Sequence, residues 1–120
     1  MRHKYPLKIC ILFVFFLSIH DINNAQDISK TDSLKQELSA ADDTSKIAIL
    51  NKLCWEFRNS EIQHSITYGI QSVELAEKYK DHKNLAQAYS FLGVAYRNIG
   101  NYSKAFDNYY KGLETAKKYK

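Results

Sequence analysis

Two arginine–asparagine pairs are the residues whose types and spacing could carry recognition chemistry in this sequence. Arg58-Asn59 and Arg97-Asn98 lie 39 residues apart, and Trp55 precedes the first pair. A guanidinium group binds a carboxylate through two parallel hydrogen bonds, and a nearby tryptophan adds an apolar or cation–π anchor. The pattern therefore points to recognition of an acidic group or of a C-terminal carboxylate.

Catalytic and metal-binding motifs are missing from the sequence. It contains no Gly-rich phosphate loop, no His-Glu-x-x-His and no Cys-x-x-Cys. We expect His64 in a turn and His82 in a linker, both as solvated side chains. Cys54 has no companion thiol outside the leader and is expected to be a small apolar core residue. We therefore predict a non-enzymatic protein with no metal and no cofactor.

The elements that must position these residues are helices. Apolar residues recur at spacings of three and four, which is typical of a helical face, and the chain has one proline and four glycines. We expect a short helix over 27–40, a polar break over 41–44, and a helix from Lys46 that Asp43 or Thr44 caps. A further break at 59–61 and a helix over 65–79 follow. The apolar positions of these segments are Ile28, Leu34, Leu38, Ile47, Leu50, Leu53, Cys54, Phe57, Ile66, Gly69, Ile70, Val73 and Ala76.

The segment 84–120 closely resembles a tetratricopeptide repeat (TPR), and the segment before it repeats the pattern. The residues that carry the resemblance are Tyr89, Leu92, Gly93, Tyr96, Ala105 and Tyr109. Leu53 and Phe57 match Leu92 and Tyr96 at an offset of 39, whereas the second helices match at an offset of 40, which predicts a one-residue gap in the first turn. The resemblance implies an all-α solenoid of about two antiparallel helix hairpins. We expect a degenerate unit over 46–82, a clear unit over 84–120, and a capping helix with its linker over 26–45.

Close packing of small residues is part of this expectation. Gly93 is expected to face Ala105 and Gly112 on the second helix of its unit. The large residues expected to fill the space around this contact are Tyr89, Leu92, Tyr96, Phe106 and Tyr109.

The resemblance also implies a partner-binding groove on the first helix of each unit. The positions expected to face it are Asn51, Trp55, Arg58, Asn59, Gln87, Ser90, Val94, Arg97 and Asn98. In the functional interpretation, the groove binds an extended protein segment or peptide with an acidic group or a C-terminal carboxylate. In the competing interpretation, the arginines are solvated or paired with Glu56 and Glu61, and Trp55 packs on the capping helix.

The first 25 residues have the order of a secretory signal peptide. Arg2, Lys4 and Lys8 precede the uncharged apolar run 9–19, and Ala25 ends a polar stretch that suits cleavage. The run is shorter than the roughly 20 residues that span a bilayer. We expect an exported protein, periplasmic or extracellular, with an uncleaved membrane anchor as the alternative.

The net charge and the number of repeats limit the kinds of partner that the sequence predicts. The mature part carries 14 Lys and Arg against 12 Asp and Glu, so its net charge of +2 predicts no nucleic-acid partner. A final repeat without a neighbour leaves Phe106, Tyr110 and Leu113 partly uncovered, which predicts possible self-association. We expect a non-catalytic protein-interaction module. The alternative is the input region of a larger histidine kinase or helix-turn-helix regulator, which the chain resembles in its leader and repeats.

Overall fold

The computed structural model describes residues 29–120, and the expected signal peptide lies outside the described residues. Residues 29–40 are helical. Four further helices follow: α2 (Asp43–Phe57), α3 (Ile62–Lys78), α4 (His82–Asn98) and α5 (Tyr102–Lys118). The described part of the chain contains helices and turns but no strand, which confirms the all-α prediction.

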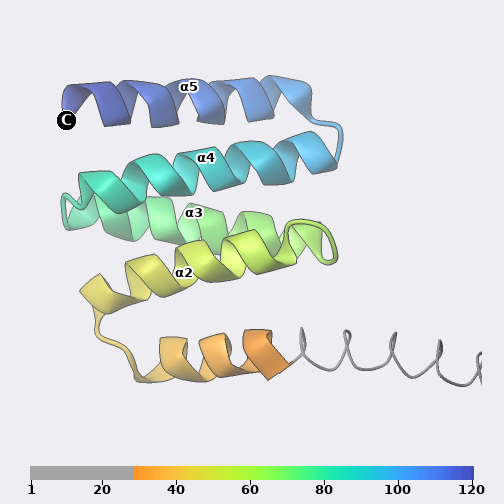
Figure 1. Cartoon of the computed structure of the whole chain (residues 1–120), viewed down its shortest axis with the longest axis vertical. Coiled ribbons are helices and arrows are strands. Elements are labelled where there is room, and N and C mark those ends of the chain that lie inside the picture. Colours follow the sequence, from red (N-terminus) through yellow and green to blue (C-terminus); the bar gives the residue numbers. More distant parts are fainter. Residues whose placement is uncertain (1–28) are drawn as a thin grey trace, which may run out of the picture. The chain divides into compact units, whose positions relative to one another are not determined.

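Within the unit Leu34–Lys120, helices α2 to α5 form a stack of two helix hairpins. Helices α2 and α3 form the first hairpin and α4 and α5 the second, and α4 packs on both α2 and α3 (Figure 1). This arrangement confirms the predicted TPR-like solenoid. We call α2 and α4 the A helices and α3 and α5 the B helices.

The turns between helices are short and differ between the two hairpins. Four residues, 58–61, separate α2 from α3, and three residues, 99–101, separate α4 from α5, so the helix bounds do not show the shorter first turn that the repeat offsets predicted. The turn after α4 contains Gly100 with a φ of 78°, and the turn after α3 contains Lys80 with a φ of 55°. A positive φ suits glycine because it has no Cβ. Gly100 therefore allows the second hairpin to reverse direction sharply.

Side-chain caps fix where the helices begin. Asp42 caps α2 by accepting a 2.8 Å hydrogen bond from the Ser45 backbone N–H, so the predicted cap at Asp43 or Thr44 was wrong by at least one residue. These hydrogen bonds stabilise the charged carboxylate and lower the pKa of Asp42. Asp81 and Asn101 cap α4 and α5 in the same way.

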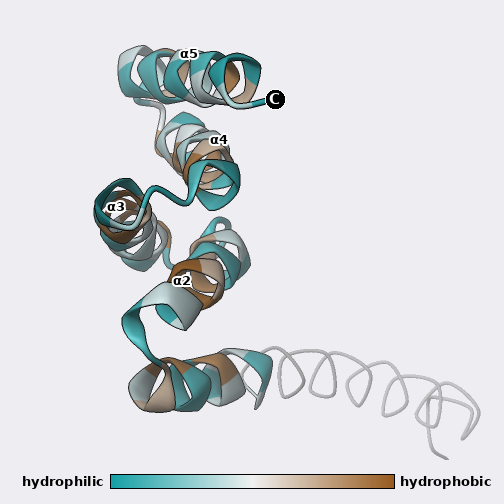
Figure 2. Ribbon diagram, turned by 90° about the vertical axis from the view of Figure 1, so that its left-hand side faces the viewer, coloured by the Kyte–Doolittle hydropathy of each residue, from teal (hydrophilic) through white to brown (hydrophobic). Residues whose placement is uncertain are grey.

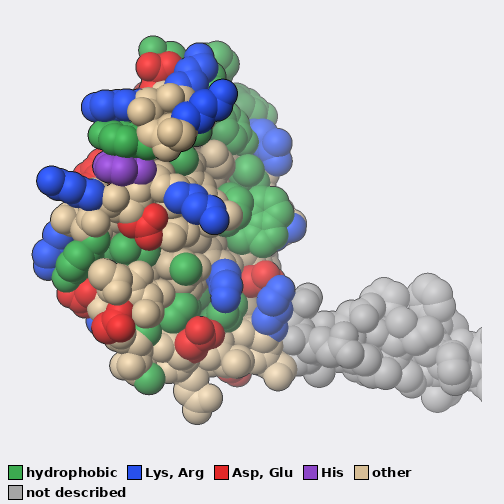
Figure 3. Space-filling view, turned by 60° about the vertical axis from the view of Figure 1, so that its left-hand side comes forward, with side chains coloured by type: hydrophobic (Ala, Val, Ile, Leu, Met, Phe, Trp, Pro, Cys, Tyr) green, Lys and Arg blue, Asp and Glu red, His purple; other side chains and the backbone are tan. Residues whose placement is uncertain are grey.

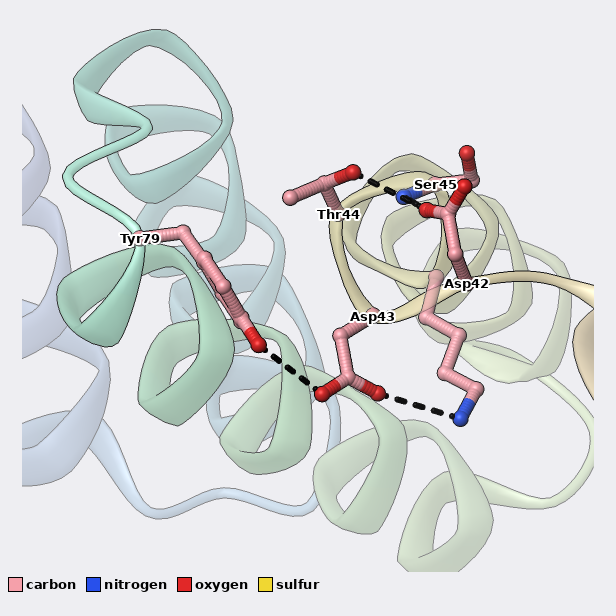
Figure 4. Close-up of polar contacts among 6 residues, drawn as sticks. Asp42, Asp43, Thr44, Ser45 and Tyr79 are labelled. Carbon is pink, nitrogen blue, oxygen red and sulfur yellow. Dashed lines mark hydrogen bonds and ion pairs between the residues drawn. The ribbon is translucent and has the colours of Figure 1, made fainter.

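Asp43 instead joins the two ends of the first hairpin (Figure 4). Its carboxylate accepts a 2.9 Å hydrogen bond from the Tyr79 hydroxyl, which comes from the C-terminal end of α3. It also pairs with the Lys46 ammonium group at 3.3 Å. Both contacts favour the charged carboxylate and lower the pKa of Asp43, with the Tyr79 hydrogen bond contributing most.

The core follows the interior seam of the stack, where the hydrophobic ribbon segments of α2, α3 and α4 face one another (Figure 2). Leu34 packs on Phe57 and Leu53 at the N-terminal end of the unit. Between the hairpins, Ile66 of α3 packs on Leu92 of α4, and this contact joins them. Burying such side chains is the main favourable contribution to the stability of the fold.

Glycines provide the close approaches, although with partners other than those predicted. A Cβ on Gly93 would lie 2.5 Å from a ring carbon of Tyr109, so the ring of Tyr109 fills the space above Gly93. The expectation that Gly93 faces Ala105 and Gly112 was therefore wrong about the nearest partner. Phe106 does not pack around this contact either, because its side chain is 76% exposed.

None of the helices within residues 29–120 combines the length and the apolar character that a bilayer span requires.

Candidate functional site

An aromatic pair joins the two A helices. The Trp55 ring of α2 lies 4.9 Å from the Phe91 ring of α4, measured between centroids. The Arg58 guanidinium covers the indole at 3.7 Å from its centroid, close enough for a cation–π contact. Trp55 remains 37% exposed, so a ligand can reach this cluster. We call the surface that carries Trp55, Arg58 and Phe91 the A-helix surface.

The two arginine–asparagine pairs meet at one end of this surface. The Asn98 side-chain amide donates to the Arg58 carbonyl at 2.8 Å and to Asn59 Oδ1 at 3.0 Å. Arg97 donates to Asn98 Oδ1 at 3.4 Å. Asn98 therefore links the turn after α2 to the end of α4 and brings the two arginines to neighbouring helix ends.

The remaining expected positions on α4 lie at its surface to different degrees. Gln87 and Ser90 are exposed, and Val94 is half-buried. The Ser90 hydroxyl donates back to the Ala86 carbonyl at 3.0 Å, so its donor is already used within α4. Gln87 and Val94 lie in the same row of α4 as Phe91, whereas the Ser90 hydroxyl lies beside Gly112 of α5, and none of the three side chains carries a charge.

Asn51 does not face a groove, and its assignment as a groove residue was wrong. It is 1% exposed and lies among α2, α3 and α4. Its amide nitrogen donates to the Asn84 carbonyl at 3.0 Å, and its Oδ1 accepts from the Ser72 hydroxyl at 2.7 Å. Satisfied partners make a buried amide tolerable, so Asn51 fixes the packing of the hairpins rather than a ligand.

The competing interpretation of the arginines, as solvated or paired with Glu56 and Glu61, fits the structure in part, because Arg97 is exposed. Glu61 pairs with His64 and not with an arginine. The Arg58 guanidinium donates to the Trp55 carbonyl, and the Arg97 guanidinium donates to Asn98 Oδ1. Trp55 packs on α4 rather than on the capping helix, whose Leu34 contacts Phe57.

Phe91 is the surface residue that sequence reasoning missed. Gln87, Phe91, Val94 and Asn98 follow one another at spacings of four, three and four, which places them on one face of α4. This row could have identified Phe91 once Gln87 and Val94 were assigned to the surface.

A second concave region lies between the two B helices. It is an open cavity of about 820 Å³ over the N-terminal half of α4, with Leu85 and Tyr89 among its lining residues and with Lys80, Lys111 and Lys118 around it. Figure 3 shows this part of the surface: a histidine lies beside hydrophobic side chains, and Lys or Arg side chains lie around them.

The Tyr89 hydroxyl donates to Glu77 at 2.9 Å. Burial, followed by the Glu77 contact, raises the pKa of Tyr89 to about 12.

His82 contributes to this cavity and was wrongly expected in a solvated linker. It is the first residue of α4, and its ring stacks on Tyr119 with a centroid separation of 3.4 Å and an interplanar angle of 3°. Its Nδ1 is buried and has no hydrogen-bond partner among the described residues. His64 lies in the first turn of α3, exposed beside Glu61.

Cys54 is placed as predicted, in the core. Its thiol is fully buried and lies 3.6 Å from the Ser65 hydroxyl. Burial raises the pKa of the thiol to about 11, so the nucleophilic thiolate is scarce at neutral pH. Residues 29–120 contain no group of three His, Cys, Asp or Glu side chains that could hold a metal ion.

Comparison with known proteins identifies the repeats. The family model described as tetratricopeptide repeat matches residues 55–118, which is more than half of the chain and includes parts of both hairpins. Searches of curated proteins and of solved structures found no significant match. Proteins of this repeat family typically serve as non-catalytic scaffolds for protein–protein interaction. The repeated hairpins and the family match together show that this chain belongs to the tetratricopeptide repeat family.

Proposed function

We propose that the A-helix surface binds an extended segment of a protein partner that carries an acidic group or a C-terminal carboxylate. The observation that supports this most directly is the cluster of Trp55, Phe91 and Arg58, which combines exposed aromatic area with a cation. Aromatic and arginine side chains are the residues that most often dominate binding energy at protein interfaces.

The electrostatics of the surface favour an anion. One Arg58 N–H donates to the Trp55 carbonyl at 2.6 Å, and this bond holds the guanidinium flat against the indole. A guanidinium has five N–H donors, so most of those on Arg58 remain for a ligand. Arg97 contributes a second cation from the last turn of α4, on the neighbouring helix end.

The aromatic pair supplies the apolar part of the proposed contact. Trp55 and Phe91 come from different repeats, so a segment that crosses them contacts both A helices at once. The ordered pair loses little side-chain freedom on binding because its rings already pack on each other. We infer a bound segment with an apolar side chain near Trp55 and a carboxylate near Arg58.

A peptide display experiment tests this proposal. The probe is a library of extended peptides with free C-terminal carboxylates, and the same sequences with amidated C-termini report the contribution of the terminal charge. We expect Arg58→Ala to weaken the binding of selected peptides about 10- to 100-fold. This loss corresponds to the roughly 1.5–3 kcal/mol that a hydrogen bond to a charged group contributes. Arg58→Lys should recover only part of this loss, because an ammonium group lacks the planar fork.

Lys83→Ala is the matched control, because it removes an exposed cation from the start of α4, away from the aromatic pair. Equal binding by the wild type and by Arg58→Ala and Trp55→Ala would refute the A-helix surface as the site. Equal binding of amidated and free peptides would instead refute the terminal carboxylate and leave an acidic side chain as the anion.

We also propose that the protein acts outside the cytoplasm. The support comes from sequence alone: basic residues, the apolar run 9–19 and a small residue at Ala25 follow one another as in a signal peptide. N-terminal sequencing of the exported protein should find a start at or near Gln26. An intact Met1 in the membrane fraction would favour the anchor instead.

A further inference from the structure

The cavity between the B helices has a largely aromatic wall. We call it the B-helix cavity, and its volume is about 820 Å³. The stacked rings of His82 and Tyr119 line it together with Tyr89 and Tyr110. Leu85, only 8% exposed, adds an aliphatic side chain. Small-molecule sites have volumes of this order and are mostly apolar with a few polar groups. The wall therefore suits a ligand with a flat apolar part.

Three lysines supply cations beside this wall. The Lys111 ammonium group lies 5.8 Å from the centroid of the Tyr89 ring, and the Lys118 ammonium group lies 5.2 Å from the centroid of the Tyr119 ring. Lys80 lines the cavity from the turn after α3. A ring that packs against these tyrosines therefore brings any anionic group it carries close to an ammonium group.

The two carboxylates of the lining already have partners in the protein. Glu77 accepts the Tyr89 hydroxyl at 2.9 Å, and Glu114 lies 4.0 Å from the ammonium group of Lys117. Three lysines and two glutamates give the lining a net charge of +1, with histidine counted as neutral. This balance favours an anionic ligand over a neutral or a cationic one.

The first repeat has a cavity at the equivalent place with a different lining. Its volume is about 530 Å³, and its lining positions on α2 and α3 correspond to those of the B-helix cavity on α4 and α5 at offsets of 39 and 40 residues. Asp43 stands at the position of His82, and Gln71 at the position of Lys111. Among the described residues, its two lysines balance its two acidic residues and no aromatic side chain lines it. The stacking of repeats therefore accounts for a cavity here, whereas the aromatic and cationic lining belongs to the second repeat.

We propose that the B-helix cavity binds a small aromatic anion. Its planar ring packs against the wall of tyrosine and histidine rings, and its carboxylate or phosphate group lies beside the ammonium groups of Lys111 and Lys118. An ammonium group acts as a point charge and demands no planar geometry, so it accepts either kind of anion. The B-helix cavity shares no residue with the A-helix surface, so either proposal can fail while the other stands.

An NMR titration of the isotope-labelled full chain tests the proposal with three probes that share one ring system. They are naphthoate, naphthyl phosphate and the neutral naphthamide. We expect both anions to shift the amide signals of residues that line the cavity, with dissociation constants of about 0.1–1 mM, as suits a small ligand in an open site. Naphthamide should bind at least about 3-fold more weakly, and added salt should reduce this difference because it screens exposed charges. The tighter of the two anions identifies the class of the anionic group.

Lys111→Gln gives the B-helix cavity the side chain that the first cavity has at this position. We expect it to weaken the binding of both anions about 3- to 5-fold, the effect of one exposed charge pair, and to leave naphthamide binding unchanged. Lys104→Gln is the matched control. Lys104 is an exposed lysine of α5 whose ammonium group also lies near a tyrosine ring, 5.3 Å from the centroid of Tyr96, but it does not line the cavity. Both lysines are exposed, so both variants should keep their fold.

Tyr110→Ala tests the aromatic wall separately from the charge. It should weaken the binding of all three probes by a similar factor, at least about 3-fold, because each probe has the same ring. Tyr102→Ala is the control, since Tyr102 is a tyrosine of α5 with an exposed fraction of 71%, against 60% for Tyr110, and it lies outside the cavity lining.

Three results would overturn the proposal. The first is equal binding of naphthoate, naphthyl phosphate and naphthamide, because the lysines would then select no charge. The second is equal affinity of Lys111→Gln and Lys104→Gln for the two anions. The third is a set of shifted amide signals that excludes the cavity lining and centres on Trp55 and Phe91, which would place the probes on the A-helix surface.

Discussion

The Tyr79 hydroxyl donates a 2.9 Å hydrogen bond to the Asp43 carboxylate and so ties the end of α3 to the start of α2. The second repeat joins the same two places with different chemistry. Tyr119, forty residues after Tyr79, stacks its ring on His82, which lies 39 residues after Asp43. A tyrosine at the end of each B helix thus closes its own hairpin, once through its hydroxyl and once through its ring.

Tyr79→Phe should change how stability depends on pH. The Tyr79 hydrogen bond is the main cause of the lowered Asp43 pKa in the folded protein. A lowered folded-state pKa means that the contribution is complete above the ordinary value of 3.8 and is lost as the pH falls through the folded-state value. We expect Tyr79→Phe to be less stable than wild type at neutral pH and to lose less stability on acidification.

The pKa of Asp43, measured by NMR titration, should rise in Tyr79→Phe. Tyr119→Phe serves as the control, because Tyr119 contacts His82 with its ring. It should leave the titration of Asp43 unchanged. An unaltered Asp43 titration in Tyr79→Phe would contradict the role of this hydrogen bond.

Gly69→Ala should destabilise the protein more than Gly93→Ala does. A Cβ on Gly69 would lie 2.6 Å from the Leu92 side chain, which is only 3% exposed and has no room to move. A Cβ on Gly93 would meet the Tyr109 ring, which is 37% exposed and can swing outward. Overpacking costs about 1–3 kcal/mol, whereas replacing glycine by alanine within a helix gains about 1 kcal/mol. We therefore expect a net loss for Gly69→Ala and a change near zero for Gly93→Ala.

Urea denaturation measures both free energies of unfolding. Leu92→Ala in the Gly69→Ala background provides the test of mechanism, because it removes the atoms that the new methyl group contacts. The double variant should lose less than the sum of the two single changes. If the two losses in the free energy of unfolding simply add, the contact of the new methyl group with Leu92 is not the cause of the destabilisation by Gly69→Ala.

Cys54 should react with thiol reagents only when the protein opens. Burial raises the pKa of its thiol to about 11, so at pH 8 the thiolate is scarce and the sulfur is inaccessible. In a Cys10→Ser variant, which leaves Cys54 as the only cysteine, labelling should be slow in buffer and fast in denaturant. Rapid labelling of the folded protein would contradict the buried position.

Short-range spacing was sufficient to predict the helices and the repeat. Apolar residues at intervals of three and four define the buried face of a helix by themselves, because 3.6 residues complete a turn. The matched positions of Leu53 and Leu92 therefore located both A helices from the sequence alone. The same spacing placed Trp55 on the outside of α2, where the structure has it.

Contacts between repeats were decided by the tertiary structure. Asn51 looks like a surface residue by type, but Ser72 and Asn84 from two other helices satisfy its amide, so it can be buried. The pairing of Trp55 with Phe91 depends in the same way on how α4 is set against α2. Residue spacing fixes which side of a helix is buried, whereas the partner of each side chain depends on the angle and offset at which separate helices pack. Sequence alone therefore determined the repeated hairpins, and only the packed structure decided which polar and aromatic side chains are left for a ligand.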